Sequence, residues 1–150
     1  MTMDQNCARA RALLEQEGYT CVLARGEAVC TSRERGVGPL LQWLASGADF
    51  QGFSAADKVV GRAAAFLYVL LGVPALYAGV ISRPALAVLE EHGIRVSYTS
   101  LVPAIRNRTD TGFCPMESAV LQISDPAQAL VVIQNKVQEL RRAGNPVQHS

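Results

Sequence analysis

A long uncharged run, residues 63–81, constrains the fold of this chain more than any other feature. At nineteen residues it is long enough to form one membrane-spanning helix. Gly72, Pro74 and Gly79 interrupt it, however, and the Gly72-to-Pro74 segment is typical of a helix end followed by an extended segment. We therefore expect a buried helix before Gly72 and a buried strand after Pro74, rather than a membrane span.

A second helix and a second strand follow the uncharged stretch. After the strand predicted over 75–81, Ser82 is a typical N-cap residue, Pro84 suits a first helical turn, and Gly93 suits a left-handed helix end. Residues 94–100 then form the next predicted strand. A strand–helix–strand unit of this length joins parallel strands.

The segment before the uncharged stretch predicts a helix over 4–17 that ends at Gly18, then a β-hairpin and a short helix over about 39–45. The hairpin strands, within 19–24 and 28–32, turn around Gly26-Glu27, so that Leu23 faces Cys30. Ser54 and Asp57 have the spacing of a capping box, which predicts that the next helix begins there and continues to about Leu71.

The C-terminal part predicts an irregular segment over 103–113 and a short helix from Cys114 to about Leu121. A last helix begins after Asp125 and ends at about Arg142. Together the elements predict one α/β domain over residues 1–150: a three-layer α/β/α sandwich with a mixed sheet, an N-terminal hairpin and a parallel βαβ unit. Its core spans about 4–142, and 143–150 form a frayed tail.

The charge balance argues against nucleic-acid or membrane steering, because 14 basic and 13 acidic residues leave a net charge of +1. The N-terminal residues are polar and lack the apolar stretch of a secretion signal, so we expect a cytoplasmic protein with reduced thiols. The four cysteines include no C-x-x-C pair and the chain has only two histidines, so no four-ligand zinc site, and no other metal site or cofactor, is predicted. Dinucleotide, P-loop and serine-hydrolase motifs are also absent.

Four motifs, in order along the chain, resemble those of the domain-of-unknown-function family 1893. They are SRERG at 32–36, ADKVVGRAAA at 56–65, RNR at 106–108 and CPME at 114–117. The resemblance covers about residues 19–135. It implies a divergent branch of the cytidine-deaminase-like fold, with no assigned biochemical function, and a homodimer.

The resemblance departs from working zinc deaminases at the metal ligands. Those enzymes open the first buried helix with His-x-Glu or Cys-x-Glu and the next with Pro-Cys-x-x-Cys. The predicted helices here open with Ala55-Ala56-Asp57 and with residues 82–88, which hold neither Cys nor His. Because hydrolytic deamination uses the metal to make hydroxide at neutral pH, we expect a zinc-less fold without that activity.

The candidate ligand-binding residues are basic or acidic and come from four segments. Asp57 and Lys58, at the predicted start of the buried helix, would hold an anion or a nucleotide-like ligand, with Asp57 as a proton acceptor. The alternative is a helix cap and a surface lysine. Arg33 and Arg35 follow the second hairpin strand and would receive a phosphate or carboxylate, or else form a solvated turn.

The remaining candidates lie in the C-terminal half. Arg106 and Arg108, with Asn107 between them, form a second basic pair. Cys114 begins a predicted helix, where the helix dipole favours thiolate, so it is a candidate nucleophile; the alternative is a structural cysteine. Glu117 would bind a ligand or pair with Arg106 or Arg108.

Three hypotheses follow for the function. The first is a protein that binds a nucleotide-like or phosphorylated small molecule in a pocket formed by these residues. The second is a metal-independent enzyme that uses Asp57 or Cys114 in the same pocket. The third is a structural or interaction protein without a ligand.

Overall fold

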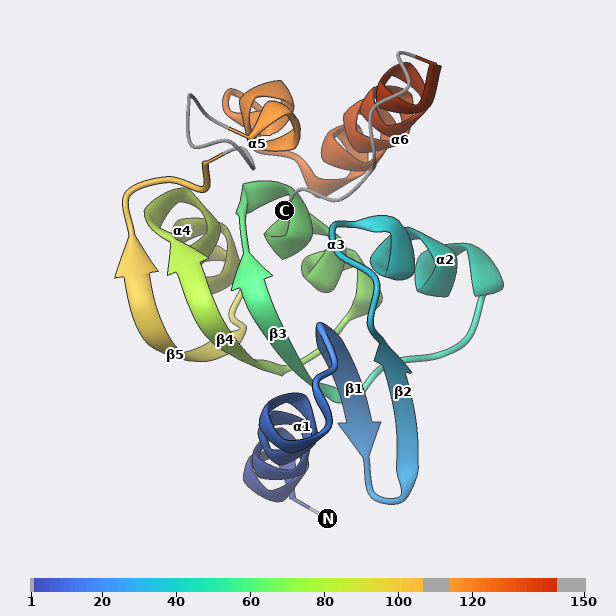
Figure 1. Cartoon of the computed structure of the whole chain (residues 1–150), viewed down its shortest axis with the longest axis vertical. Coiled ribbons are helices and arrows are strands. Elements are labelled where there is room, and N and C mark those ends of the chain that lie inside the picture. Colours follow the sequence, from blue (N-terminus) through green and yellow to red (C-terminus); the bar gives the residue numbers. More distant parts are fainter. Residues whose placement is uncertain (1, 107–113, 143–150) are drawn as a thin grey trace.

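The computed structural model describes residues 2–106 and 114–142, which form a five-stranded mixed sheet with helices on both faces (Figure 1). The elements, in chain order, are α1 (Met3–Glu17), β1 (Cys21–Arg25), β2 (Ala28–Ser32), α2 (Gly38–Ser46), β3 (Ser54–Val60), α3 (Arg62–Leu71), β4 (Ala75–Ser82), α4 (Arg83–Glu91), β5 (Arg95–Val102), α5 (Pro115–Val120) and α6 (Pro126–Arg142).

The strands lie in the order β2-β1-β3-β4-β5. β1 pairs antiparallel with both β2 and β3, whereas β3, β4 and β5 are parallel to one another. The carboxyl ends of these three parallel strands therefore meet at one edge of the sheet, and α5 lies beyond that edge (Figure 1). In open α/β sheets this edge is where ligands usually bind.

The two faces of the sheet are covered by different helices. On one face α1 packs Ala10 and Leu14 against Val22, Ala56 and Tyr77 of the sheet. On the other face the core is formed by α2, α3 and α4, and α6 packs against α3. Most residues of α3 are fully buried, so this helix is the centre of the larger core.

Most predicted elements are confirmed. The uncharged stretch divides into α3 and β4 at Gly72, which adopts the left-handed conformation (φ 81°). The hairpin has the predicted register, with Leu23 opposite Cys30, and the Ser82 hydroxyl caps α4 by accepting from the Ala85 amide at 3.2 Å. Within the described residues, no helix combines the length and the apolar character that crossing a membrane requires. The predicted frayed tail lies outside the described residues.

The predicted helix over 54–71 is wrong in its first half, because residues 54–60 form the strand β3 and α3 begins only at Arg62. β3 is hydrogen-bonded on both sides, to β1 and β4, and these two ladders outweigh the weak strand propensity of its Ala-Ala-Asp-Lys segment. The Ser54 hydroxyl does not cap a helix but donates to the carbonyl of Met3 at 3.2 Å. Asp57 and Lys58 are therefore strand residues, not the start of a helix.

One testable consequence concerns Gly79 in the middle of β4. A Cβ atom at this position would lie 2.8 Å from the carbonyl oxygen of Lys58, which is backbone and cannot rotate away. We expect Gly79→Ala to lower the free energy of unfolding by about 1–3 kcal/mol, measured by urea denaturation. Ser97→Ala, on the neighbouring strand, is the control and should change it by less than about 0.5 kcal/mol. Equal stability of the two variants would contradict this packing of β3 against β4.

Candidate functional site

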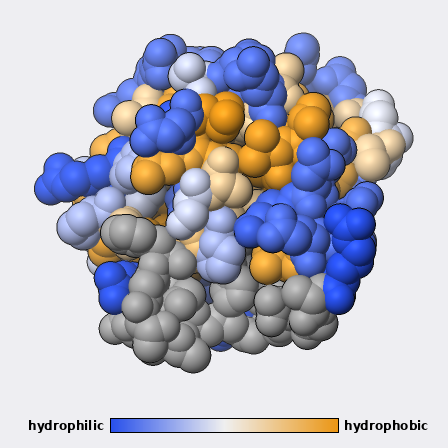
Figure 2. All heavy atoms as spheres, turned by 90° about the horizontal axis from the view of Figure 1, so that it is seen from above, coloured by the Kyte–Doolittle hydropathy of each residue, from blue (hydrophilic) through white to orange (hydrophobic). Residues whose placement is uncertain are grey.

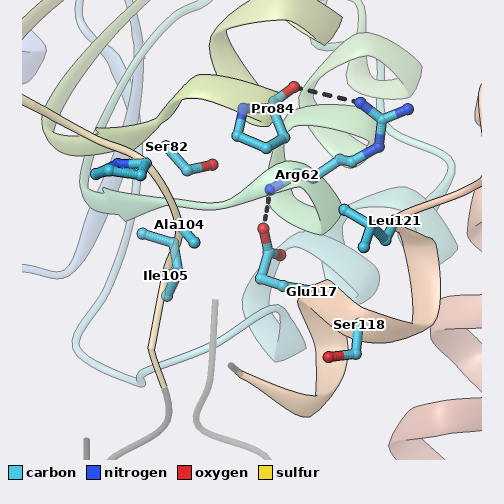
Figure 3. Close-up of a pocket in the computed structure, with 9 residues that line it drawn as sticks. Arg62, Ser82, Pro84, Ala104, Ile105, Glu117, Ser118 and Leu121 are labelled. Carbon is cyan, nitrogen blue, oxygen red and sulfur yellow. Dashed lines mark hydrogen bonds between the residues drawn. The ribbon is translucent and has the colours of Figure 1, made fainter. Parts of the chain in front are cut away.

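A cavity of about 200 Å³ lies at the carboxyl edge of the sheet, beyond the ends of β4 and β5 (Figure 3). It is lined by the first residue of α3, the end of β4 and the start of α4, the segment after β5, and α5, and it is open to solvent on one side. The residues that line it are Arg62, Ser82, Pro84, Pro103, Ala104, Ile105, Glu117, Ser118 and Leu121.

Glu117 of α5 points across the cavity at the N-terminus of α3 (Figure 3). One of its carboxylate oxygens, Oε1, accepts the backbone N–H of Arg62, and Oε2 accepts the backbone N–H of Ala63 at 3.1 Å. These are amides that a helix leaves without partners in its own first turn. The side chain is buried, and burial raises the pKa of Glu117, while the bonds from the two amides oppose that rise. An acidic side chain of the protein thus occupies the place where a helix N-terminus can bind an anion.

Gly61 makes room for this contact. It precedes α3, with an extended backbone (φ −95°) that any residue can adopt. A Cβ atom there would overlap the carboxyl group of Glu117. The glycine is therefore required by the close approach of Glu117 rather than by the backbone conformation.

The guanidinium group of Arg62 also binds α5 to the start of α3, through hydrogen bonds to backbone carbonyls. Nε donates to the carbonyl of Val120 at 3.1 Å, Nη1 donates to that of Pro84 at 3.4 Å, and Nη2 donates to that of Ile123. The group also lies over the ring of Phe66, 5.0 Å from its centre. Arg62 thereby joins α3 to the start of α4 and to the end of α5.

The remaining cavity wall is mainly apolar. Figure 2, which looks onto the end of the molecule that carries α5 and α6, shows apolar side chains gathered among polar ones, and Leu121 is 54% exposed. The polar residues among those that line the cavity are Arg62, Ser82, Glu117 and Ser118. Each carboxylate oxygen retains lone pairs after accepting one amide, so Glu117 can accept a further hydrogen bond from a molecule in the cavity.

Asp57 does not line this cavity. Its side chain is buried between β3 and α3, where Oδ2 accepts from the Tyr68 hydroxyl at 2.6 Å and Oδ1 accepts from the Val59 amide at 3.2 Å. Burial raises the pKa of Asp57 to about 7, although the hydrogen bonds from Tyr68 and Val59 favour the charged form. The same burial raises the pKa of Tyr68 well above its ordinary value.

Cys114 is fully buried at the N-cap of α5 and does not line the cavity either. Burial raises the pKa of its thiol, and the nearby amides of Met116 and Glu117 lower it by less. Burial thus disfavours the thiolate that a helix start would favour, and supports the alternative of a structural cysteine. Among the described residues, no three His, Cys, Asp or Glu side chains are grouped so as to hold a metal ion.

The predicted basic residues do not line the cavity or lie outside the described residues. Arg33 is exposed; it donates to the carbonyl of Glu17 at 2.9 Å and lies over the ring of Tyr19. Arg35, Lys58 and Arg106 are exposed. Asn107 and Arg108 lie outside the described residues. Of the candidates that the structure describes, only Glu117 lines the cavity, and it binds the start of α3.

Arg62 is the charged residue of the cavity lining that was not predicted from the sequence. The helix predicted from Ser54 to about Leu71 included Arg62 as an interior position, and an arginine at such a position is interpreted as an ordinary polar residue on a helix surface. The signal that could have identified it is the sequence Gly61-Arg62 directly before an entirely apolar run, because a glycine there indicates that one element ends and a new helix begins.

Comparison with known proteins identifies a family and a similar solved structure. Residues 9–137 match the sequence profile TM1506, described as a domain of unknown function (DUF1893). The fold is similar to the crystal structure of a DUF1893 family protein (TM1506) from Thermotoga maritima, with a TM-score of 0.82 and 27% sequence identity over 88% of this chain and 90% of that chain. A search of curated proteins finds no significant match.

The contact between Glu117 and α3 predicts a graded loss of stability. Glu117→Ala leaves the buried amides of Arg62 and Ala63 without a partner and should lower the free energy of unfolding by about 2–4 kcal/mol. Glu117→Gln retains one acceptor oxygen and should lose less than half of that. Urea denaturation measures both. Ser118→Ala, on the same short helix, is the control and should lose no more than about 0.5 kcal/mol; a loss as large as that of Glu117→Ala would contradict a specific role for the carboxylate.

Buried Asp57 predicts a dependence of stability on pH. With a pKa of about 7 in the folded protein and an ordinary value of 3.8, Asp57 keeps a proton on folding that the unfolded chain releases. This contribution is fully present below about pH 4 and is lost as the pH rises to about 7. Relative to Asp57→Asn, the wild type should therefore lose up to about 4 kcal/mol of unfolding free energy between pH 4 and pH 8, measured by urea denaturation.

The matched control is the exposed residue Asp49, changed to Asn, which should retain the pH dependence of the wild type. If the difference between wild type and Asp57→Asn were the same at every pH, the carboxyl group would not titrate in this window.

Proposed function

This chain belongs to the DUF1893 family, and we propose that it is a small-molecule binding protein whose ligand occupies the cavity beside Glu117. The ligand that fits best is an uncharged heterocycle of nucleobase or nucleoside type. The observation that carries the proposal is a buried carboxylate with free acceptor capacity in the wall of an apolar cavity, at the edge of a parallel sheet where α/β proteins bind ligands.

The size and wall of the cavity favour a compact, flat molecule. About 200 Å³ is smaller than the pocket of a drug-sized ligand, about 300–1,000 Å³, and suits one or two fused rings. Ring N–H or amino groups would donate to Glu117, and the Ser82 and Ser118 hydroxyls supply further hydrogen bonds. Proline, isoleucine and leucine side chains would contact the faces of the rings.

Charge argues against a phosphate inside the cavity. The amides at the start of α3, which would otherwise attract an anion, already bind Glu117. A phosphate next to this carboxylate would meet a like charge in a poorly solvated place. Of the expected ligands, the base or nucleoside part of a nucleotide therefore fits the cavity better than a phosphorylated group.

The architecture supports a cytidine-deaminase-like fold for this binding site. A β-hairpin followed by helices that alternate with parallel strands is the arrangement that the resemblance implies. The metal ligands of zinc deaminases have no counterpart at the starts of α2, α3 or α4, which read Gly38-Pro39, Arg62-Ala63 and Arg83-Pro84. We therefore propose binding, and not hydrolytic deamination, as the function of this cavity.

The alternative of a metal-independent enzyme has less support. It requires Asp57 or Cys114 to face the ligand, whereas both side chains are buried and neither lines the cavity. No observation favours it over binding.

A thermal-shift screen against free nucleobases, nucleosides and the matching nucleoside monophosphates tests the proposal. We expect at least one base or nucleoside to raise the melting temperature by several degrees, and its monophosphate to raise it no more. Ala104→Phe fills the cavity and should abolish the shift, while Glu117→Gln should weaken binding about tenfold or more through loss of the charged acceptor.

Ala87→Phe places the same added ring on the exposed surface of α4 and should leave the shift unchanged. A shift that survives Ala104→Phe would put the ligand elsewhere. Absence of any shift across the screen would favour a structural or interaction protein.

A further inference from the structure

The strand β5 forms a free edge of the sheet. It pairs with β4 from Arg95 to Val102 and has no neighbour on its other side among the described residues. Four consecutive residues in its middle, 97–100, are exposed, and the Tyr98 side chain is 43% exposed. The strand at the opposite edge, β2, has only five residues.

The backbone groups that face outward from β5 follow from its pairing. The Arg95 N–H donates to the carbonyl of Pro74, just before β4, so the backbone groups of Arg95 face β4. This direction alternates along a strand. The N–H and carbonyl groups of Val96, Tyr98 and Ser100 therefore face outward.

β5 lacks the features that usually prevent an edge strand from pairing with a strand of another chain. Natural edge strands are protected by lysine, proline, inward-facing charges or bulges. Residues 96–102 include no proline, no glycine and no charged side chain. Arg95, the one charged residue of β5, already pairs with Asp4 of α1 at 2.7 Å.

We propose that β5 pairs antiparallel with β5 of a second copy of this chain, about a twofold axis at Tyr98. In this register Tyr98 lies opposite Tyr98 of the other copy, and Val96 lies opposite Ser100. Each outward N–H then meets an outward carbonyl, because the three outward residues are symmetric about Tyr98. The two sheets join into one continuous sheet.

The same register favours a second copy over an unrelated peptide as the partner. Arg95 is held by α1, so the residues that alternate with it, including Tyr98, face the side of the sheet that carries α4. The twofold axis keeps both copies of Tyr98 on that side, where the two rings contact each other and lose their exposure to water. The partner strand is then identical to β5 itself. A contact with twofold symmetry uses the same surface on both copies, so the assembly is complete as a dimer.

Charge reversal at the axis tests the proposal, because a residue on a twofold axis meets itself. We expect the wild type to show twice the mass of one chain by light scattering at high micromolar concentration. Tyr98→Lys alone and Tyr98→Glu alone should each be monomeric. A mixture of the two variants should recover the dimer, as a heterodimer, since opposite charges then face each other across the axis.

Val131→Lys and Val131→Glu are the controls, because Val131 is 55% exposed on α6, away from β5, and both should remain dimeric. If the Tyr98 variants do not fold, Ser100→Pro is the alternative test. It removes the Ser100 N–H, which faces outward and makes no hydrogen bond to β4, so the variant should fold and be a monomer. A wild type that stays monomeric at every concentration overturns the proposal and leaves the edge for an extended segment of another protein. A dimer that persists in both single Tyr98 variants overturns it as well.

Discussion

The contact between α5 and the start of α3 holds together the elements at the carboxyl edge of the sheet. α5 has only six residues, which is too short to be stable as an isolated helix. Glu117 fixes it by accepting the first amides of α3, and Arg62 fixes the chain after it by donating to the carbonyls of Val120 and Ile123. Each residue satisfies backbone groups at the end of the other's helix. The cavity lies between α5, held in this way, and the chain at the ends of β4 and β5.

This exchange also sets the electrostatics of the cavity. A helix that starts after a parallel strand normally offers its free amides and positive dipole to an anion. Here that position is filled by a residue of the chain itself, and the Arg62 guanidinium is directed at carbonyl groups instead of at the cavity. The cavity thus presents an acceptor where the fold would otherwise present donors, and this reversal is the physical reason to expect a ligand that donates hydrogen bonds.

Prediction from sequence succeeded where local signals agreed with tertiary structure and failed where they conflicted. Gly18, Gly26 and Gly72 mark backbone turns with positive φ, and they placed α1, the hairpin and the division between α3 and β4 correctly. β3 was missed because Ser54 and Asp57 imitate a capping box, while its strand conformation depends on β1 and β4, which are distant in sequence. The error moved the start of α3 and so concealed Arg62. Glu117 was identified as a candidate, but its partners are backbone amides, which no residue pattern reveals.

Although the predicted start of α3 was wrong, the candidate residue Asp57 that it suggested is a buried acid in contact with α3. Asp57 contacts the C-terminal half of this helix, whereas Glu117 contacts its N-terminus. Tyr68 donates to Asp57 from the last turns of α3, and Glu117 caps the first turn, so acids on two different elements hold the same central helix. Burial raises the pKa of both, and each therefore favours the folded state less as the pH rises. The segment 103–105 then connects this region to the edge strand: it lines the cavity and follows directly after β5.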